Sequence, residues 1–259
     1  MVALVTGGGR GIGQGVALRL AREGWSVAVT ARSAEQLNGT VAAAEGKMTA
    51  IPADIADPAS VHLLTRRVET ELGPIDLLVN NAAAPGPLGP FWENDPGEWW
   101  RCQEVNVRGP MMCCHEIIPG MITRQRGRIV NVVSGAGCFA VPDMSAYVAS
   151  KTALIRMSEQ LALELRPHGV AVFPIRPGIV RTAMVEQART RIPLVQKLLD
   201  EGREVTPDVV AELVLFLASG QADALSGRLI SVDRDYRQMA HRAEEALREE
   251  VGLLRTKEL

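Results

Sequence analysis

The chain alternates short runs of apolar, often β-branched residues with longer stretches whose apolar residues recur at helical intervals. The strand-like runs are MVALVT, SVAVTA, MTAIPA, IDLLVNN, RIVNVVS, VAVFPIRP and RLISVD. Helical patterns lie between them, over 13–23, 58–72, 146–165 and 208–218. Fully apolar strands separated by helices are typical of a parallel sheet covered on both sides. The pattern therefore predicts an α/β fold with a Rossmann-like, doubly wound parallel sheet in a three-layer α/β/α sandwich, formed as a single domain.

Two segments depart from this alternation. Residues 183–206 are rich in Arg, Gln and Leu, and we expect a helical insertion there. Beyond residue 233 the chain is charged, with apolar residues at helical spacing, which predicts a terminal helix. We assign residues 1–233 to the α/β domain and 234–259 to a charged helical extension of it. This extension is either a functional element or a solvated tail.

Composition narrows the classes of function. The 28 basic and 30 acidic residues are mixed along the chain and give a net charge of −2, which argues against nucleic acid or an anionic membrane as a partner. No apolar run reaches the roughly 18 to 20 residues that span a bilayer, and no signal-peptide pattern begins the chain. We expect a soluble, cytoplasmic protein. Cysteines and histidines follow no metal-ligand spacing, so we expect reduced, buried thiols and no metal site.

The glycine-rich stretch TGGGRGIG, residues 6–13, joins the first strand to the first helix. Glycine allows a tight turn and close approach to a pyrophosphate, which the N-terminus of a helix stabilises. This context predicts a dinucleotide site. At the end of the second strand, Ala31 and Arg32 stand where a carboxylate would bind the ribose of NAD(H). Because Arg32 and Arg10 can bind a 2′-phosphate, we favour NADP(H); if both arginines are merely solvated, NAD(H) is the alternative.

The stretch SAYVASK, residues 145–151, contains one of only two tyrosines. Tyr147 and Lys151 are four residues apart and share one helix face, where an isolated pair of this kind is ordinarily a surface feature. A phenol titrates near pH 10, and a nearby ammonium and oxidised nicotinamide favour its ionised form, which suits it to acid–base work. Ser134 adds a hydroxyl that can orient a carbonyl oxygen. Together these residues predict hydride transfer between a carbonyl compound and an alcohol.

The order of these motifs resembles the short-chain dehydrogenase/reductase family over residues 1 to about 233. The resemblance also includes Asp54 in ADIAD, NNAA at 80–83, Asn106 in VNVRG and RPGIVRT at 176–182. It implies that Asn106, Ser134, Tyr147 and Lys151 form the catalytic group, with Asn106 anchoring a water in the proton path. It also implies that Asn80 braces the sheet beneath the cofactor.

The same resemblance implies which residues bind the cofactor. Asp54 and Ile55 would hold the adenine ring, and Lys151 would bind the nicotinamide ribose. Thr182 and the backbone of Ile179 would fix the carboxamide. The full expected set is Gly7, Gly9, Arg10, Gly11, Ile12, Gly13, Arg32, Ser33, Asp54, Ile55, Asn81, Ala82, Tyr147, Lys151, Pro177, Gly178, Ile179 and Thr182.

The substrate should lie among the loops at 84–92, 135–144 and 183–206. These loops are mostly apolar, so we expect a small to medium, fairly apolar and neutral ketone, aldehyde or alcohol. Trp99 and Trp100 are expected to pack a helix against its neighbour. Family members associate through helices spanning about 100–124 and 146–165, and we expect a homotetramer, or else a dimer.

Two other functions are compatible with these motifs. One uses the nicotinamide for epimerisation or dehydration, and the other is a cofactor-binding sensor with an inert site. The final strand run ends in SVDRD where many relatives have Asp-Gly-Gly. If the two glycines of the relatives have positive φ angles, the bulkier residues of this chain change the path of the backbone. We therefore do not expect this segment to share the loop geometry or subunit packing of the family.

Overall fold

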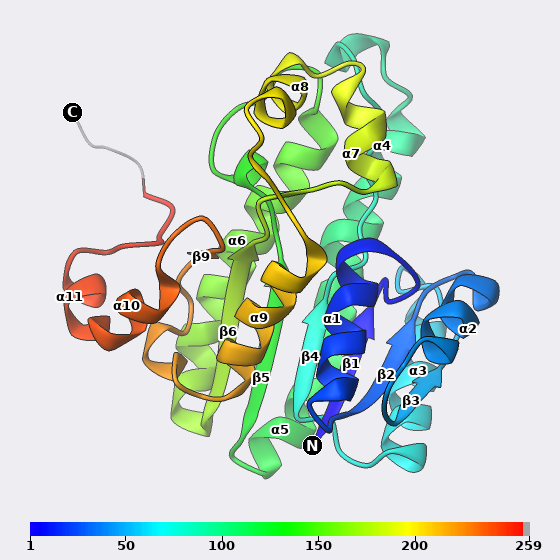
Figure 1. Cartoon of the computed structure of the whole chain (residues 1–259), viewed down its shortest axis with the longest axis vertical. Helices are drawn as coiled ribbons and strands as arrows, with labels where there is room; N and C mark the ends of the chain where they lie inside the picture. Colours follow the sequence, from blue (N-terminus) through cyan, green and yellow to red (C-terminus); the bar gives the residue numbers. More distant parts are fainter. Residues whose placement is uncertain (256–259) are drawn as a thin grey trace.

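Seven strands form one parallel sheet in the computed structural model, which describes residues 1–255 (Figure 1). They are β1 (Val2–Thr6), β2 (Ser26–Thr30), β3 (Met48–Ala50), β4 (Leu77–Asn80), β5 (Gly127–Val132), β6 (Val170–Arg176) and β9 (Ile230–Ser231). Their order is β3-β2-β1-β4-β5-β6-β9, so the chain builds outward from β1 and then restarts beside it with β4. The carboxyl ends of all strands therefore meet at one edge, and the winding direction switches between β1 and β4. The predicted doubly wound α/β fold is confirmed.

Helices cover both faces of this sheet and give the three layers (Figure 1). One face is covered by α1 (Gly11–Arg22), α2 (Ala34–Ala42) and α9 (Pro207–Ala218), and the other by α3 (Pro58–Glu71), α5 (Gly109–Thr123) and α6 (Ser145–Leu165). The other helices are α4 (Pro96–Gln103), α7 (Ala183–Arg189), α8 (Pro193–Asp200), α10 (Tyr236–His241) and α11 (Ala243–Arg248), with the short turns η1 (Phe91–Glu93), η2 (Glu104–Arg108), η3 (Gly135–Gly137), η4 (Arg166–His168) and η5 (Asp223–Leu225). Within residues 1–255, no helix has the length and apolar character needed to cross a membrane.

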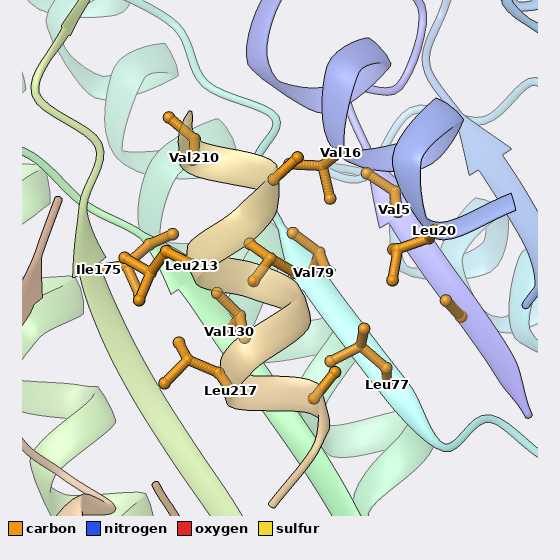
Figure 2. Packing of buried hydrophobic residues seen from close by; sticks show 14 of the residues in the cluster. Val5, Val16, Leu20, Leu77, Val79, Val130, Ile175, Val210, Leu213 and Leu217 are labelled. Atoms are coloured by element: carbon orange, nitrogen blue, oxygen red, sulfur yellow. The ribbon is translucent and has the colours of Figure 1, made fainter. Parts of the chain in front are cut away.

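Alternating strand residues supply both layers of the core. In β1, Val5 belongs to the cluster under α1 and α9, whereas Leu4 belongs to the cluster under α3 and α5. Figure 2 shows the first cluster, in which side chains of the two helices, including Val16 and Leu213, lie against strand residues such as Val79. Burial of each such side chain contributes about 1.5–3 kcal/mol. This packing holds the strands whose ends carry the site.

The helix expected over 100–124 is not continuous. Helices α4 and α5 are separated by η2, a π-helical turn in which Gly109 N–H bonds to the carbonyl of Glu104. A π turn adds one residue to the helical repeat and is frequent at functional sites. Asn106 lies in this turn, so the irregularity coincides with a residue expected in the catalytic group.

The expected insertion at 183–206 is helical, as α7 and α8, but it also contains a strand. β8 (Glu204–Val205) pairs in parallel with β7 (Ile179–Val180) to form a separate two-stranded sheet. The insertion is therefore tied at its end to the RPGIVRT segment. This pairing lacks a distinct pattern in the sequence, because two-residue strands are too short to show one.

The single terminal helix expected beyond residue 233 is instead two short helices, α10 and α11, broken at Arg242. The break lets both helices contact the core: Tyr236 packs on Phe216 with ring centroids 5.3 Å apart, and Ala246 is buried. Further along, the Gly252 carbonyl accepts a hydrogen bond from Leu229 N–H at 2.8 Å. The described part of the extension, up to residue 255, is thus packed against the domain.

Candidate active site

The glycine turn between β1 and α1 packs against the end of β4. The Thr6 hydroxyl accepts hydrogen bonds from the backbone N–H groups of Asn81 (3.0 Å) and Ala82 (3.1 Å), and the Asn81 amide donates to the carbonyls of Thr6 (3.0 Å) and Gly7 (3.2 Å). Gly7 has a φ of +66°, and a Cβ on Gly13 would lie 2.3 Å from the Gly7 carbonyl oxygen. Only glycine suits these two positions. The turn therefore forms the cradle that a pyrophosphate needs at the N-terminus of α1.

Thr182 lies beside this turn although it is distant in sequence. A Cβ on Gly11 would meet the Thr182 Cγ2 at 3.0 Å, and the Thr182 hydroxyl caps α7 through the N–H of Val185 at 3.4 Å. Gly178 turns the preceding chain with a φ of +71°, and Ile179 lies in β7. Two segments expected to bind the cofactor thus meet at the same edge. Of their other expected residues, Gly9 and Pro177 are buried, Ile12 is partly buried and Arg10 is exposed.

Positive charge follows the end of β2. Arg32 is exposed, as Arg10 is, and within residues 1–255 neither guanidinium has an acidic partner at ion-pair distance. Ala31 occupies the place where a carboxylate would select NAD(H). Ser33 has a local structural role, because its hydroxyl accepts the N–H of Gln36 at 3.3 Å as the N-cap of α2. The two arginines remain available for a phosphate.

Two neighbours hold the carboxylate of Asp54 after the end of β3. Its carboxylate accepts the Ala56 N–H at 3.0 Å and an Arg101 N–H at 2.7 Å. Burial raises the pKa of Asp54, but the Ala56 hydrogen bond, the hydrogen bond and charge of Arg101, and the charge of Arg32 together bring it below its usual value. The neighbouring Ile55 is buried against the start of α5. Arg101 was not anticipated from the sequence, since α4 is 47 residues away.

The side chains of Ser134, Tyr147 and Lys151 come together where β5 ends and α6 begins. Lys151 is only 2% exposed, and its amine donates a hydrogen bond to the Val132 carbonyl at 2.9 Å. The amine also lies 5.6 Å from the centroid of the Tyr147 ring. The Ser134 hydroxyl lowers the pKa of the Tyr147 phenol by hydrogen bonding, and it accepts the Ala136 N–H at 3.2 Å. The pair on α6 is therefore not a surface feature.

Burial shifts the pKa values of both Tyr147 and Lys151 in the protein without cofactor. Burial raises the pKa of Tyr147 to about 12, and the Ser134 hydrogen bond offsets only part of this rise. Burial also lowers the pKa of Lys151 to about 8. Without an added positive charge, the phenol keeps its proton at neutral pH. The expected stabilisation of the phenolate also depends on a bound oxidised nicotinamide, so it stays a prediction.

Asn106 joins three segments through its buried side chain. Its oxygen accepts the Ala84 N–H at 2.7 Å, and its amide donates to the Ala84 carbonyl at 2.9 Å and to the Ser150 hydroxyl at 2.9 Å. Ser150 in turn donates to the carbonyl of Tyr147 at 2.8 Å. Asn106 thus links the loop after β4 to the first turn of α6. Sequence reasoning missed this linking role and the part played by Ser150.

A second buried polar chain crosses the sheet below the site. The Asn80 amide donates to Asn131 at 2.8 Å, and the Asn131 amide donates to the Ser158 hydroxyl at 2.8 Å. These bonds connect β4, β5 and α6, in agreement with the bracing role expected of Asn80. The signal for Asn131 was present in the sequence, because it is a polar residue inside the apolar run RIVNVVS.

On the substrate side, the three expected loops meet around Tyr147. Met144, Ala188 and Ile192 form a buried apolar cluster, against which Leu88, Val141, Tyr147, Val148 and Val195 pack. Leu88 also lines an adjoining open cavity of about 670 Å³. The other residues around this cavity are Gly86, Pro87, Glu93, Asn94, Asp95, Glu98, Gln187, Thr190 and Arg191. The surroundings of the tyrosine are apolar, whereas the outer cavity is more polar than the loop composition suggested.

The two adjacent tryptophans differ in environment. Trp99 is half-buried and donates a hydrogen bond to the Ser145 hydroxyl at 3.0 Å, which connects α4 to α6 as expected. Trp100 is 62% exposed, so the packing role predicted for it is not found within residues 1–255. Consecutive residues on a helix point about 100° apart, which is why only one of the two can face α6.

The cysteines are free, but they are not uniformly buried. Cys102, Cys113 and Cys114 lie in the interior, whereas Cys138 is exposed beside η3. The expectation of burial is wrong for Cys138 because the loop that carries it lies at the surface. Within residues 1–255, no three His, Cys, Asp or Glu side chains are grouped so as to hold a metal ion.

The doubly wound sheet and the glycine turn at its carboxyl edge define a Rossmann-fold protein of the α/β class. The chain belongs to the short-chain dehydrogenase family, whose family model, described as short chain dehydrogenase, matches residues 1–193. It is an oxidoreductase of that family, which acts on alcohol and ketone groups.

Individual relatives agree over most of the chain. A short-chain dehydrogenase/reductase from Armillaria gallica is 36% identical over 90% of this chain and 94% of its own length. A crystal structure of an actinorhodin polyketide ketoreductase variant with NADPH has a TM-score of 0.83 and 32% identity, covering 89% of this chain and 95% of that one. A crystal structure of NAD⁺-bound xylitol dehydrogenase also has a TM-score of 0.83, with 29% identity and coverage of 89% and 96%.

Proposed function

We propose that this protein is an NADP(H)-dependent oxidoreductase that interconverts a ketone or aldehyde and an alcohol by hydride transfer, with Tyr147 as the general acid and base. The observation that carries this proposal is the grouping of Ser134, Tyr147 and the buried amine of Lys151 beside the glycine-turn edge of the sheet. Burying a charged lysine costs free energy unless the ammonium has a hydrogen-bonding or oppositely charged partner. Here the amine lies 5.6 Å from the centroid of the Tyr147 ring, where its charge would stabilise the phenolate.

In the reductive direction, a reduced nicotinamide bound at the glycine turn would supply the hydride. Tyr147, which is protonated at neutral pH because of its raised pKa, donates its proton to the carbonyl oxygen as negative charge develops there. The Ser134 hydroxyl donates a hydrogen bond to the same oxygen and fixes its position. Lys151, still mainly protonated at pH 7 with a pKa of about 8, stabilises the phenolate that remains. In the oxidative direction, Tyr147 takes the proton back.

Asn106 holds the segments around Tyr147 in place. Its side chain holds the loop at Ala84 and the Ser150 hydroxyl, and Ser150 bonds to the Tyr147 carbonyl. The π turn around Asn106 departs from the regular helical hydrogen-bond pattern. We propose that the Asn106 backbone carbonyl binds a water that returns protons to Lys151.

The preference for NADP(H) rests on charge at the end of β2. Arg10 and Arg32 are exposed, Ala31 carries no carboxylate, and a 2′-phosphate would receive bidentate hydrogen bonds from either guanidinium. The solved neighbours include an NADPH complex and an NAD⁺ complex with equal TM-scores, so overall similarity does not distinguish the two cofactors. The two arginines favour NADP(H).

The substrate proposed is a small to medium, fairly apolar carbonyl compound. Tyr147 packs on the same apolar cluster as Val141 and Leu88, and an uncharged, apolar group next to the reacting carbon would replace water there at little cost. The more polar cavity beyond Leu88 would accommodate a solvated part of a larger substrate.

A homotetramer, or else a dimer, is proposed as the active assembly. Trp100, Met111 and Leu163 are exposed large apolar residues on α4, α5 and α6, the helices of the expected interface. Such side chains gain about 25 cal/mol for each Å² of apolar surface removed from water. Light scattering tests this assembly, and a monomer at micromolar concentration would contradict it.

The test of the cofactor proposal is fluorescence titration with NADPH and NADH, followed by turnover of a panel of ketones and aldehydes with the tighter cofactor. We expect tighter binding of NADPH and about a 10- to 100-fold rise in its Kd in Arg32→Ala, as expected for a lost charged hydrogen bond. Arg66→Ala, which changes an exposed arginine on α3, is the matched control. Equal or tighter binding of NADH would contradict the NADP(H) assignment, and NADPH binding without any turnover would favour a sensor.

A further inference from the structure

Tyr147 lies in the first turn of α6, where a helix unwinds most easily because its first N–H groups lack intrahelical partners. A side-chain cap is the usual way to stabilise the start of a helix. Among the described residues 1–255, the N-cap residue of α6, Met144, makes no side-chain hydrogen bond to this turn. The turn that carries Tyr147 therefore depends on contacts from elsewhere in the fold.

Side chains of α4 and η2 supply these contacts. The indole N–H of Trp99 donates to the Ser145 hydroxyl at 3.0 Å, and the side-chain amide of Gln103 donates to the Ala146 carbonyl at 2.8 Å. Gln103 follows Trp99 by four residues and precedes Asn106 by three, which is the spacing of residues on one helix face. This face lies against the start of α6.

The two peptide groups that flank Tyr147 are both held from this face. The Ala146 carbonyl belongs to the peptide group that precedes Tyr147, and Gln103 binds it directly. The Tyr147 carbonyl belongs to the peptide group that follows, and Asn106 holds it through the Ser150 hydroxyl, with hydrogen bonds of 2.9 and 2.8 Å. Asn106 belongs to the expected catalytic group, whereas no motif in the sequence singles out Gln103.

The hydrogen bond from Gln103 is not needed to satisfy the backbone of α6. Within this helix the Ala146 carbonyl accepts the N–H four residues further along, and its second lone pair accepts the Gln103 amide. The bond therefore adds a directional constraint between α4 and the peptide group before Tyr147.

We propose that Gln103 is a positioning residue, which fixes the Tyr147 hydroxyl for proton transfer by holding the Ala146 carbonyl. This inference rests on the proposed role of Tyr147 as general acid and base. A proton donor must stay within hydrogen-bond distance of the reacting oxygen, and a displacement of about 1 Å can lower the rate about 100-fold. A small rotation of the peptide group before Tyr147 is amplified at its hydroxyl, because that atom is the farthest of the side chain from the backbone.

The first test is Gln103→Met in the full-length protein, which keeps the length of the side chain but removes its N–H donors. We expect kcat for the best carbonyl substrate to fall about five- to twentyfold. The Kd of the cofactor, measured by fluorescence, should change less than about twofold, because other hydrogen bonds hold the glycine turn. Gln160→Met is the matched control, since it changes an exposed glutamine of α6 that bonds to Glu164, and its kcat should equal that of wild type.

Gln103→Glu adds a readout that a loss of packing alone would not change. At neutral pH the carboxylate of this variant only accepts hydrogen bonds, so it cannot bind the Ala146 carbonyl. Protonation restores one donor, and the pKa of a glutamate, ordinarily about 4.3, rises beside another acceptor. The kcat of Gln103→Glu, divided by that of wild type at the same pH, should therefore increase as the pH is lowered from 8 to 5.

A double variant shows whether Gln103 acts through Tyr147. In a Tyr147→Phe background there is no hydroxyl to position, so Gln103→Met should lower the residual turnover less than about twofold. A further loss as large as in the wild-type background would show that Gln103 does not act through Tyr147.

Failure of this inference and failure of the proposed function give different results. Full turnover in Tyr147→Phe contradicts the proposed function and leaves no proton donor for Gln103 to position. A large loss of turnover in Tyr147→Phe, together with a wild-type kcat in Gln103→Met, overturns the role of Gln103 alone. A loss of kcat in Gln103→Glu that is the same at every pH from 8 to 5 overturns the hydrogen bond to Ala146 as its cause.

Discussion

At the cofactor end of the cleft the glycine turn is held by backbone and amide hydrogen bonds from Asn81 and Ala82, whereas at the substrate end Tyr147 is enclosed by apolar side chains from three loops. The first arrangement depends on close backbone approach at positions such as Gly13 and tolerates little change. The second depends on packing and can change in shape while the chemistry is kept. In the proposed function, cofactor binding is therefore carried by short motifs, and substrate choice by loop side chains.

The largest expected effect is on turnover, and it tests the catalytic role of Tyr147 separately from cofactor binding. Tyr147→Phe removes the proton donor but keeps the ring packed against the cluster of Met144, Ala188 and Ile192. Turnover of the best carbonyl substrate should fall about 10³-fold, while the Kd of NADPH changes less than about twofold. Tyr236→Phe, at the other tyrosine, is the matched control and should retain turnover. Unchanged turnover in Tyr147→Phe would remove the catalytic assignment.

The second largest expected effect is on the stability of the glycine turn and on NADPH binding. Gly13→Ala places a Cβ 2.3 Å from the Gly7 carbonyl oxygen, so the turn must shift. We expect a loss of about 2–4 kcal/mol in the free energy of unfolding, measured by urea denaturation, together with at least a tenfold rise in the Kd of NADPH. Gly39→Ala in α2 is the control, because nothing lies within 4 Å of its Cβ and alanine favours the helix. An equal free energy of unfolding for Gly13→Ala and wild type would contradict the claim that the glycine turn has no room for a Cβ at this position.

The smallest effect is a pH dependence at the junction of the two ends. Lys151 has a pKa of about 8 in the folded protein, below its usual 10.5, so between these values the unfolded chain binds more protons. Stability from this group therefore rises with pH in that window. The difference in unfolding free energy between wild type and Lys151→Met should shift by about 2 kcal/mol in favour of wild type from pH 8 to 9.5.

Comparison with the variant is needed because other groups titrate in the same range. Burial raises the pKa of Cys113 and of Cys114 to about 12, and these thiols make the folded state less favourable as pH rises. They are present in both proteins and cancel in the difference. A difference that stays constant from pH 8 to 9.5 would show that Lys151 is not charged and desolvated as described.

Most strands and helices of the doubly wound fold could be predicted from the sequence, because the residue patterns that indicate them are local. Runs such as MVALVT and RIVNVVS, with helical patterns between them, indicated the strands of the parallel sheet and the covering helices. The boundaries were less accurate where tertiary contacts decided them. The terminal segment forms two helices because Tyr236 and Ala246 both reach the core, and the 100–124 region contains a π turn at Asn106. The periodicity of the sequence indicates neither the break between the two terminal helices nor the π turn.

The sequence by itself determined the doubly wound frame, the glycine turn and the Tyr147–Lys151 spacing, because strand patterning, positive φ and helical repeat act within a few residues. Only the tertiary structure decided that Arg101 pairs with Asp54, that Asn106 holds Ala84 and Ser150, and that Met144 and Ile192 share the cluster on which Tyr147 packs. Those contacts join residues far apart in the chain. Their partners are chosen by which helices and loops the packed sheet brings together, and that choice depends on the energy of the whole core rather than on any one segment.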